Sequence, residues 1–512
     1  MITLLLLIPI IGSLFLVPIK ELDSTQVREL VEESEKLKNE NRKRLIKQIA
    51  LITSIVNLIV AIILWIQFDP STTQYQFVEE YTGLSLYKQV ENIEISLPYI
   101  HFYVGIDGIS IYFVLLTAFI TPVCILSNWE DITTKLKYYL ISFLILETLQ
   151  IAVFVVLDLL VFYVFFESVL IPLFLIIGIW GAGIPRIRAS FMLFLYTLLG
   201  SLWMLLAIMV IYNHYGSTDM QLISLKEIAL DSQKWLWLAF FISFAFKTPL
   251  FPFHIWLNFA HTSAPLGGSI ILAGVILKLA TYGYLRILIS ILPDATNYFS
   301  PLVQTIAIIS LIYASLATIR QTDIKGVVAY SSVAHMAVVV LGLFSNNIQG
   351  IQGAILLSLA HGFVSPALFI LVGGVLYHRY HTRTVNYYRG MVLTMPIFTI
   401  MFFLFTLFNM GTPLSANFIG EFLSLAGVFQ RNPVIAALGA TGIFFSACYS
   451  IWLYNRIAYG SHSKYIPVTY DISRREFMLL LPLLIATLVL GIFPNIILDT
   501  IALSVSTLLY NI

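Results

Sequence analysis

The sequence predicts an all-α polytopic membrane protein with about 14 transmembrane helices. Three observations lead to this fold class. The 512 residues are 59% hydrophobic and only 11% charged, whereas soluble domains carry about 25% charged residues. Fourteen apolar windows of about 20 residues, the length that crosses a bilayer, follow one another along the chain. Two of these windows share a Thr-Pro-Leu tripeptide inside an otherwise apolar helix, which indicates a repeated unit.

The predicted spans form a single transmembrane domain over residues 1–512. They are 2–19, 49–68, 107–127, 136–157, 159–180, 189–212, 236–258, 266–289, 300–319, 327–344, 350–377, 394–427, 433–455 and 477–508. The first apolar stretch lacks a basic n-region and an A-x-A-like cleavage site, so it is interpreted as a retained helix. Residues 20–48 are predicted to be a charged helical excursion, and residues 69–106 a polar, acidic-leaning loop.

The distribution of lysine and arginine supports this count of spans. With fourteen spans, 21 of the 28 basic residues fall in loops on one side of the membrane, four fall on the other side, and three lie inside spans. If one span had been miscounted, all later loops would change sides and the one-sided distribution would be lost. The positive-inside rule therefore predicts that the basic loops face a cytoplasm-like compartment and that both termini face outward.

The two Thr-Pro-Leu tripeptides lie in the seventh and twelfth spans, at 248–250 and 412–414. Proline removes a backbone hydrogen bond, and a bilayer tolerates the opened helix only where protein or water satisfies the freed carbonyl. Broken helices an odd number of spans apart run in opposite directions. This pattern predicts two inverted repeats, 136–292 and 300–458, with the working site near the breaks.

Ionisable side chains inside the predicted spans are the candidate functional residues. Glu167 lies near the middle of the fifth span, Lys247 directly precedes the first Thr-Pro-Leu, and Glu421 follows the second. Lys278 lies inside the eighth span, and the hairpin signal AHTSAPLGG brings that span back beside the seventh. A charge at the bilayer centre is expensive and marks a functional site by default.

Four histidines lie in the spans or hairpins between these groups: His254, His261, His335 and His361. Hydroxyl side chains at similar depths could join them through water: Thr248, Thr281, Tyr330, Ser332, Ser358 and Ser365. The serial order of acid, lysine, lysine and acid, with histidines between, predicts a proton path parallel to the membrane plane.

Structural interpretations compete with this hypothesis at each position. A buried acid–base pair can fix helix register, and a buried neutral histidine often only satisfies a hydrogen bond. Asp158, at the start of the fifth span, is expected to be a solvated or headgroup-level acid. The cluster Arg320, Asp323 and Lys325 is expected to serve loop orientation and local ion pairing.

Composition also excludes several functions. The formal net charge of +1 argues against a nucleic-acid partner, because phosphate binding needs a clear basic excess. The two cysteines, Cys124 and Cys448, are far apart in sequence, which excludes an iron–sulfur or zinc cluster within this chain. The sequence contains no GxGxxG motif after a strand and no flavin signature, so no cofactor site is predicted here.

Five stretches carry a resemblance to a known family: FFESVLIPLFLIIGIWG, FAFKTPLFPFHIWLNFAHTSAPLGGSIILAGVILKLATYGYLR, RQTDIKGVVAYSSVAHM, SLAHGFVSPALFILVGG and GTPLSANFIGEFL. From about Gly105 to Trp452 the chain resembles the antiporter-like membrane subunits of respiratory complex I, the proton-pumping NADH:ubiquinone oxidoreductase, and among them the subunit 4 family. The excursion 20–48 is longer than this family leads us to expect.

The resemblance implies fourteen helices, with two inverted five-helix repeats and broken seventh and twelfth helices. It implies that FMN, iron–sulfur clusters and ubiquinone belong to partner subunits, and that neighbouring antiporter-like subunits and lipids surround this chain. It also implies relay roles: Glu167 and Lys247 in a first half-channel, Lys278 at the centre, His335 and His361 beyond it, and Glu421 at the far end.

Three functions remain open at this point. The first is a proton-translocating subunit of complex I, and the second is a subunit of a multi-chain Na⁺/H⁺ antiporter that shares the fold. The third is a passive scaffold whose buried charges only fix helix packing. The abundance of Ile, Leu, Phe and Tyr and the lack of a visible transit peptide favour a mitochondrial gene product in the inner membrane, with the termini in the intermembrane space. A bacterial inner-membrane protein is the alternative.

Overall fold

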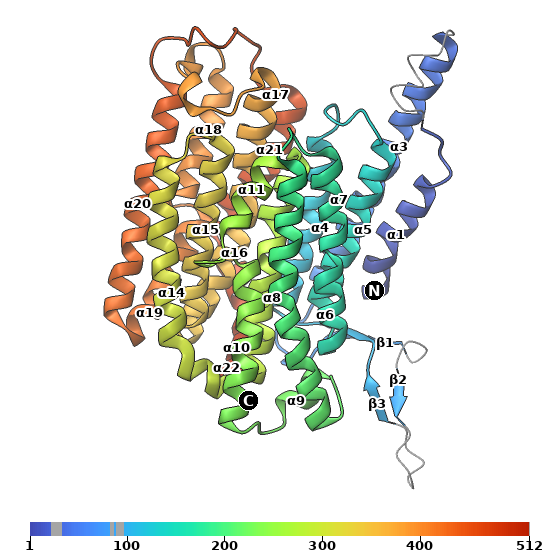
Figure 1. Ribbon diagram of the computed structural model, residues 1–512, viewed down its shortest axis with the longest axis vertical. Helices are drawn as coiled ribbons and strands as arrows, with labels where there is room; N and C mark the ends of the chain where they lie inside the picture. Colours follow the sequence, from blue (N-terminus) through green and yellow to red (C-terminus); the bar gives the residue numbers. More distant parts are fainter. Residues whose placement is uncertain (22–32, 82–85, 89–96, 511–512) are drawn as a thin grey trace.

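Long helices aligned with the longest axis of the molecule make up most of the computed structural model (Figure 1). The structure describes residues 1–21, 33–81, 86–88 and 97–510. The loop at 381–393 lies at the upper end in Figure 1, which we call the basic face. Helix α9 (Met220–Ser224) and the β-strands lie at the lower end, which we call the outer face, and both chain ends lie in the lower half.

Eleven helical stretches among the described residues are long and apolar enough to cross a membrane. Eight of them are single helices: α3 (Glu33–Gln67), α4 (Ser110–Ser127), α5 (Leu136–Val155), α8 (Arg186–Tyr215), α14 (Pro293–Arg320), α15 (Ile324–Leu343), α20 (Pro433–Ala458) and α21 (Arg474–Ile492). The fifth predicted span is α6 (Leu159–Ser168) followed directly by α7 (Leu170–Trp180). The all-α polytopic fold predicted from the sequence is confirmed.

The seventh and twelfth spans are broken, as the proline argument predicts. The seventh consists of α10 (Leu230–Lys247) and α11 (Ile255–Ser263), and the twelfth of α18 (Pro396–Asn409) and α19 (Ala416–Arg431). At the first break the amide of Leu250 donates to the carbonyl of Ala245, and at the second the amide of Thr412 donates to that of Leu407. Each bond reaches back five residues, so both helices end in the same wide turn.

The eighth and eleventh spans are continuous but contain π-helical segments, which the sequence did not predict. The eighth runs through α12 (Leu266–Ile271), η2 (Leu272–Ile276), α13 (Leu277–Gly283) and η3 (Tyr284–Ile289). The eleventh runs through α16 (Ile348–Phe369), η4 (Ile370–Leu376) and α17 (Tyr377–Tyr380). A π segment shifts the hydrogen-bond register by one residue and occurs frequently at functional sites.

One contact occurs twice, on opposite faces of the bundle. Asp158 forms an isolated antiparallel bridge with Asp219, the residue before α9 of the outer face, and Asp323 forms the same bridge with Thr384, in the 381–393 loop of the basic face. Each aspartate also caps the helix that follows it, by accepting hydrogen bonds from two backbone N–H groups. The fifth and tenth spans therefore begin alike but run in opposite directions, which supports the inverted-repeat prediction. The repeat limits 136–292 and 300–458 stay a prediction.

Two predictions need correction, one for the last span and one for the loop 69–106. The last predicted span, 477–508, is two helices, α21 and α22 (Asn495–Tyr510), because Pro494 interrupts the ladder. The predicted loop 69–106 contains strands β1 (Gln76–Glu80), β2 (Leu86–Lys88), β3 (Leu97–Ile100) and β4 (Tyr103–Ile106), paired antiparallel as β1 with β4 and β2 with β3.

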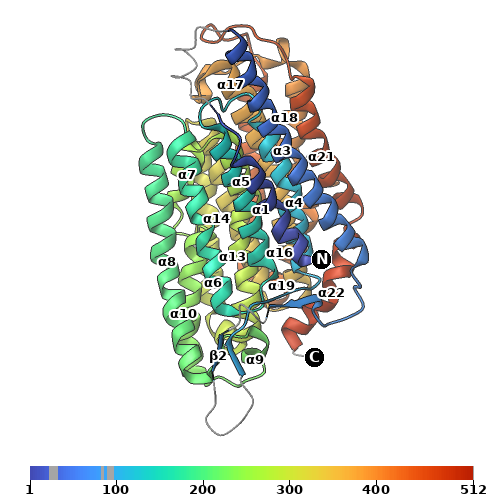
Figure 2. The ribbon, with the colours of Figure 1, turned by 90° about the vertical axis from the view of Figure 1, so that its right-hand side faces the viewer.

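The N-terminal helix α1 (Ile2–Leu16) packs beside α3 and α5 at one edge of the bundle (Figure 2). In the charged excursion 20–48, residues 22–32 lie outside the described part, and α3 begins at Glu33. Two short 3-10 turns on the basic face, η5 (Val385–Tyr387) and η6 (Met391–Leu393), complete the described elements.

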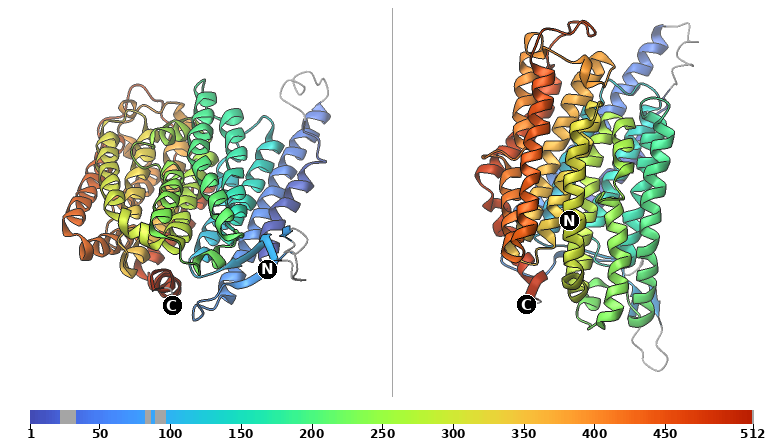
Figure 3. Two further views of the ribbon diagram at one scale, coloured as in Figure 1. Left: turned by 60° about the horizontal axis from the view of Figure 1, so that its bottom comes forward. Right: turned by 60° about the vertical axis from the view of Figure 1, so that its left-hand side comes forward.

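The most buried span is the eighth, whose apolar window lies entirely inside the protein, whereas only 39% of the window in α8 is buried. The further views in Figure 3 show α8 on the outside of the bundle and α20 at the opposite edge. The centre of the bundle is therefore shielded from lipid by a ring of apolar helices. Side chains on the eighth span can contact only other parts of the protein or internal water.

Candidate functional site

Lys278 lies on α13 at the centre of the bundle and is fully buried. Its ammonium group donates to Nδ1 of His361, 2.8 Å away. It also donates to the backbone carbonyl of Ala273, five residues earlier, in η2. The π segment interrupts the regular helical ladder, which leaves this carbonyl available to the lysine. The sequence-predicted Lys278 and His361 therefore touch directly.

His335 and Glu421 form a second direct contact on the α19 side of Lys278. Nδ1 of His335, on α15, lies 3.0 Å from Oε1 of Glu421, on α19. The rings of His335 and His361 are 5.7 Å apart between centroids. All three residues are buried. Four of the predicted groups thus follow one another in space from Lys278 through the two histidines to Glu421.

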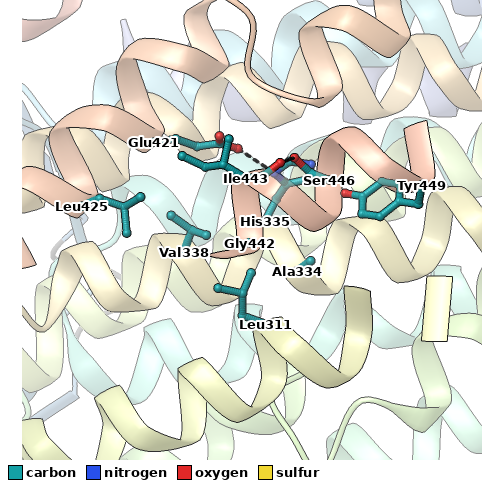
Figure 4. Close-up of a pocket in the computed structure, with 10 residues that line it drawn as sticks. All are labelled: Leu311, Ala334, His335, Val338, Glu421, Leu425, Gly442, Ile443, Ser446 and Tyr449. Atoms are coloured by element: carbon teal, nitrogen blue, oxygen red, sulfur yellow. Dashed lines mark hydrogen bonds and ion pairs between the residues drawn. The ribbon is translucent and has the colours of Figure 1, made fainter. Parts of the chain in front are cut away.

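A small cavity adjoins the Glu421 end of this series. Figure 4 shows the Glu421 carboxylate and the His335 ring directed toward each other, with Ser446 and Tyr449 beside them. The cavity volume is about 10 Å³, close to the minimum that holds one water molecule. A single water there would have the carboxylate, the imidazole and two hydroxyl groups as neighbours.

Glu167 and Lys247 are neighbours but do not form a direct ion pair in the described structure. The Lys247 ammonium donates to the backbone carbonyl of Phe166, 2.7 Å away, and lies 3.2 Å from the centroid of the Phe166 ring. The Glu167 carboxylate interacts electrostatically with this ammonium. Both of its oxygens are buried and lack a hydrogen bond of good geometry in the described structure, although the Ser201 hydroxyl lies close enough to interact with the carboxylate. The two groups of the predicted pair are therefore neighbours, but they are not in direct contact.

Between Lys247 and Lys278 the described side chains leave a gap in the series. The ring of Phe244 packs directly against Gly283, on the helix that carries Lys278. The Thr248 hydroxyl lies 3.4 Å from the Tyr284 hydroxyl, and the Thr281 hydroxyl is buried without a described partner. A buried hydroxyl without a partner normally binds water, so a proton could cross this gap only through internal water.

The two remaining histidines differ in position. His254 is half-buried at the start of α11, where its ring packs against Phe251 and Tyr330, away from the central series. His261 is fully buried and stacks on Phe369, with ring centroids 4.6 Å apart. Neither nitrogen of His261 has a described hydrogen-bond partner, and its ring interacts electrostatically with Lys325 and Lys278. The structure thus groups His261, but not His254, with the central lysine.

Lys325 was predicted to be a loop residue, and this prediction is wrong. It lies in the first turn of α15, only 3% exposed, and its ammonium donates to the carbonyl of Ala264, 3.2 Å away. Ala264 belongs to the hairpin between α11 and α12, which covers the lysine. A cavity of about 180 Å³ near the basic face reaches Lys325 past Asp131 and His378.

Asp158 is also misplaced by the sequence argument, because it is fully buried instead of solvated. Its carboxylate accepts hydrogen bonds from the Thr218 hydroxyl, at 2.6 Å, and from the His101 amide. A further buried acid, Glu147 on α5, was not singled out from the sequence. Its Oε1 accepts a hydrogen bond from Asn57, at 2.7 Å, and its Oε2 has no described partner.

Chemically, the site is a series of groups that can each gain or lose a proton, buried in a helical bundle. In the half from Lys278 to Glu421, Lys278 and His361 lie within hydrogen-bond distance of each other, and so do His335 and Glu421. The two imidazole rings between them are neighbours without a direct hydrogen bond in the described structure. The remaining steps pass through unpartnered polar atoms that require water. Such an arrangement suits proton transfer across the interior of a membrane protein.

Comparison with known proteins first defines the class of this chain. Residues 156–446 match the family model described as NADH:quinone oxidoreductase/Mrp antiporter, transmembrane region. The fold matches a chain of "Respiratory complex I from Thermus thermophilus with bound NADH", with a TM-score of 0.81 and 25% identity over 99% of this chain and 100% of that chain. It also matches a chain of the Mrp complex from Dietzia sp. DQ12-45-1b, with a TM-score of 0.82 and 18% identity over 100% and 98% of the two chains, which shows the fold alone.

Curated relatives define the particular family. The NADH-ubiquinone oxidoreductase chain 4 of Mycosarcoma maydis is 64% identical over 511 residues, covering 100% of both chains. The protein of the same name from Arabidopsis thaliana is 50% identical over 472 residues, covering 92% of this chain and 93% of the relative. The chain belongs to the NADH-ubiquinone oxidoreductase chain 4 family. The resemblance inferred from the sequence is confirmed.

Proposed function

We propose that this chain is a proton-translocating, antiporter-like subunit of the membrane arm of NADH:ubiquinone oxidoreductase (complex I). The observation that carries the proposal is the series of neighbouring groups from Lys278 through His361 and His335 to Glu421, in which the two end pairs are in hydrogen-bond contact and the two rings between them lie 5.7 Å apart. Each member is an amine, imidazole or carboxylate that can exchange a proton, and each is buried. A scaffold would need paired charges to fix helix packing, but the described partners of Lys278 are an imidazole and a carbonyl and include no carboxylate.

Proton uptake occurs from the basic face through Lys325 and His261. The 180 Å³ cavity that reaches Lys325 supports this route, because its lining includes the titratable side chains of Asp131 and His378 next to the buried ammonium. His261 follows Lys325 toward Lys278 and carries no competing hydrogen bond in the described structure. His254, which lies apart from this route, has no assigned step in transfer.

The Glu167–Lys247 pair supplies the driving step. When an acid and an amine separate in a low-dielectric interior, each loses the charge that stabilised its ionised form, so its proton affinity changes. Each pKa unit corresponds to 1.36 kcal/mol, and moving one charge against about 200 mV costs about 4.6 kcal/mol. A change of three to four units, on the order of what burial and pairing together supply, moves one proton uphill.

Protons leave the relay at the Glu421 end. A groove of about 440 Å³ between α19 and α20, lined by Phe418, Phe422 and Ala440, reaches this carboxylate from the surface of the bundle. A neighbouring antiporter-like subunit covers the groove in the assembly, so that the last group of one relay faces the first group of the next. Lipid covers the rest of the apolar perimeter.

The chain functions in the mitochondrial inner membrane, with its basic face toward the matrix and its termini in the intermembrane space. The excess of lysine and arginine in the loops of the basic face supports this orientation. NADH oxidation and ubiquinone reduction, with the FMN and iron–sulfur clusters that they need, belong to partner chains. This subunit performs no redox chemistry and acts as part of a translocase.

Replacement of Lys278 tests the proposal. In the assembled complex, Lys278→Met keeps the apolar length of the side chain but removes the transferable proton, so we expect pumping to fall by about 10²-fold at this site, the order of a lost proton-transfer group. The measurement is protons released per electron in proteoliposomes, alongside quinone reduction. Lys226→Met, an exposed lysine on the outer face, is the control and should pump normally.

Normal pumping by an assembled Lys278→Met complex would leave only the scaffold function. A transport activity that requires Na⁺, in preparations that lack flavin and iron–sulfur clusters, would instead support the Na⁺/H⁺ antiporter alternative, which the fold shared with the Mrp complex keeps open. Co-purification with a flavin- and iron–sulfur-containing assembly and Na⁺-independent pumping support complex I.

A further inference from the structure

A polar cavity opens at the outer face, at the opposite end of the bundle from the cavity at Lys325. Its volume is about 750 Å³. Its walls come from residues 73–75 just before β1, from the connection between α9 and α10, from the end of the eighth span and from α22. Polar side chains line it, among them Thr73, Gln233, Asp294, Ser504 and Thr507. An aqueous space therefore extends from the outer face into the bundle toward the span that carries Lys278.

The inner wall of this cavity is a buried ion pair. Arg286, in η3, pairs with Asp107, directly before α4, and the two side chains are only 7% and 9% exposed. The guanidinium also donates to the hydroxyls of Tyr282, at 3.0 Å, and Tyr75, at 3.2 Å. The carboxylate accepts from the amide of Ser110, at 2.9 Å. Each of the two charged groups therefore has at least one hydrogen bond in addition to the ion pair.

Between this pair and Lys278 lies a layer of aromatic rings. Lys278, Tyr282 and Arg286 follow one another at intervals of four residues and so lie on one face of the span. Eight residues of helix correspond to about 12 Å. The buried Tyr282 ring contacts the rings of Phe113 and Phe154, with centroids 6.1 Å and 5.3 Å away. The Tyr282 hydroxyl donates to the carbonyl of Phe154, at 2.9 Å, which fixes its proton in that direction.

We propose that Arg286, paired with Asp107 on the outer-face side of Tyr282 and its aromatic neighbours, is a barrier. It prevents protons in the outer-face cavity from returning to Lys278. A guanidinium cannot give up its proton in a protein, so it cannot act as a relay group. The paired Asp107 carboxylate is held by the guanidinium and by the Ser110 amide, so it is also a poor site for an excess proton from the cavity. Behind the ion pair, the Tyr282 ring packs against the buried rings of Phe113 and Phe154, which places apolar surface next to the pair.

This inference rests on the proposed function, since a barrier matters only if Lys278 carries protons. It explains an asymmetry of the described structure: the basic-face cavity ends at a lysine, which can exchange a proton, whereas the outer-face cavity ends at an arginine, which cannot. Protons taken up at the basic face can then move only along the series to Glu421. A purely structural role would require the pair to do no more than hold η3 against the start of α4.

Passive proton leak in proteoliposomes that contain the whole complex tests the barrier. The leak is measured without NADH, as the rate of internal pH change after a potassium diffusion potential is imposed with valinomycin. The double variant Asp107→Asn/Arg286→Gln removes both charges but keeps polar side chains of similar size. We expect its leak to rise about tenfold, which corresponds to a barrier lowered by about 1.4 kcal/mol. Arg286→His, which keeps a cationic partner for Asp107 but can pass a proton on, should also leak.

The matched control removes another buried ion pair. Arg379 and Glu476 are paired at 2.7 Å near the basic face, away from the outer cavity, and Arg379→Gln/Glu476→Gln should stay as tight as the wild type. Adding Lys278→Met to the leaking double variant should suppress the leak, because the route passes through that lysine.

Either of two results would overturn the barrier: assembled Arg286→His and double-variant complexes as tight as the wild type, or a leak that persists without Lys278. Neither result bears on NADH-driven pumping through Lys278. Conversely, pumping that is unaffected by Lys278→Met would contradict the proposed function whatever the leak shows.

Discussion

Backbone carbonyls, more than carboxylates, accompany the buried lysines of this chain. Lys247 donates to Phe166, Lys278 to Ala273 and Lys325 to Ala264. Each carbonyl lies where the helix is irregular: just before the α6–α7 junction, in a π segment, and in the α11–α12 hairpin. A carbonyl freed from its helix inside a bilayer needs a donor, and an ammonium supplies one. A carbonyl has no net charge. When the lysine loses its proton, no unpaired buried charge therefore remains, whereas a carboxylate partner would be left as one.

Gly411 gives a residue-scale test of the contact between His335 and Glu421. It has a positive φ of 71°, and a Cβ there would lie 2.6 Å from Oε2 of Glu421. Gly411→Ala should displace the carboxylate from His335 and slow pumping, in addition to the cost of about 1–2 kcal/mol for alanine in this backbone conformation. Pumping per electron and the thermal stability of the complex are the measurements.

The chain provides a matched control for this substitution. Gly216 has the same φ of 71°, but a Cβ there would meet nothing within 4 Å. Gly216→Ala should therefore show the backbone cost without the loss of pumping. Equal pumping in the two variants would show that the position of Glu421 does not limit transfer.

Lys325 gives a second residue-scale test, of proton uptake. Lys325→Met replaces a buried ammonium with an apolar side chain of similar length, so the change removes the hydrogen bond to the Ala264 carbonyl and leaves behind no buried carboxylate that was paired with the ammonium in the described structure. We expect the complex to assemble and its pumping to fall by about 10²-fold, as for a lost proton-transfer group. Arg320→Gln removes an exposed charge at the same face and should have no effect. If Lys325→Met pumped at the wild-type rate, uptake would have to occur elsewhere.

At the scale of elements, the sequence predicted what single residues determine and missed what packing determines. Proline fixes the breaks at 248–250 and 412–414 because it lacks an N–H group, so both were visible in the sequence. The π segments leave no such trace, since LAGVI in η2 is as apolar as any helical run.

The misplacement of Lys325 and Asp158 has the same origin. Both residues lie at the polar end of a predicted span, where a charged side chain ordinarily reaches water or headgroups. Here a tertiary contact covers each of them: the α11–α12 hairpin lies over Lys325, and residues 101 and 218 enclose Asp158. Hydropathy measures the apolar length of a segment, so it contains no information about a loop that folds back from elsewhere in the chain.

At the scale of the whole molecule, the two faces of the bundle differ in what their cavities reach. The basic-face cavity ends at Lys325 and the outer-face cavity at Arg286, while the groove beside Glu421 opens sideways. In the proposed relay, a proton that enters at the basic face therefore moves laterally toward Glu421. Long-range coupling is then expected between groups at opposite ends of the series, and this coupling can be measured.

The pair Lys278→Met and Glu421→Gln tests that coupling. If the two groups act in one series, either substitution alone blocks the route, so the double variant should pump no worse than the slower single variant, the non-additivity of residues that act as a unit. If they serve separate routes, their effects on pumping should multiply. Glu147→Gln, at a buried acid of α5 outside the series, provides the contrast, because combining it with Lys278→Met should give independent effects. Multiplicative losses for Lys278 and Glu421 would separate the two halves of the contact series and remove the basis for a lateral relay.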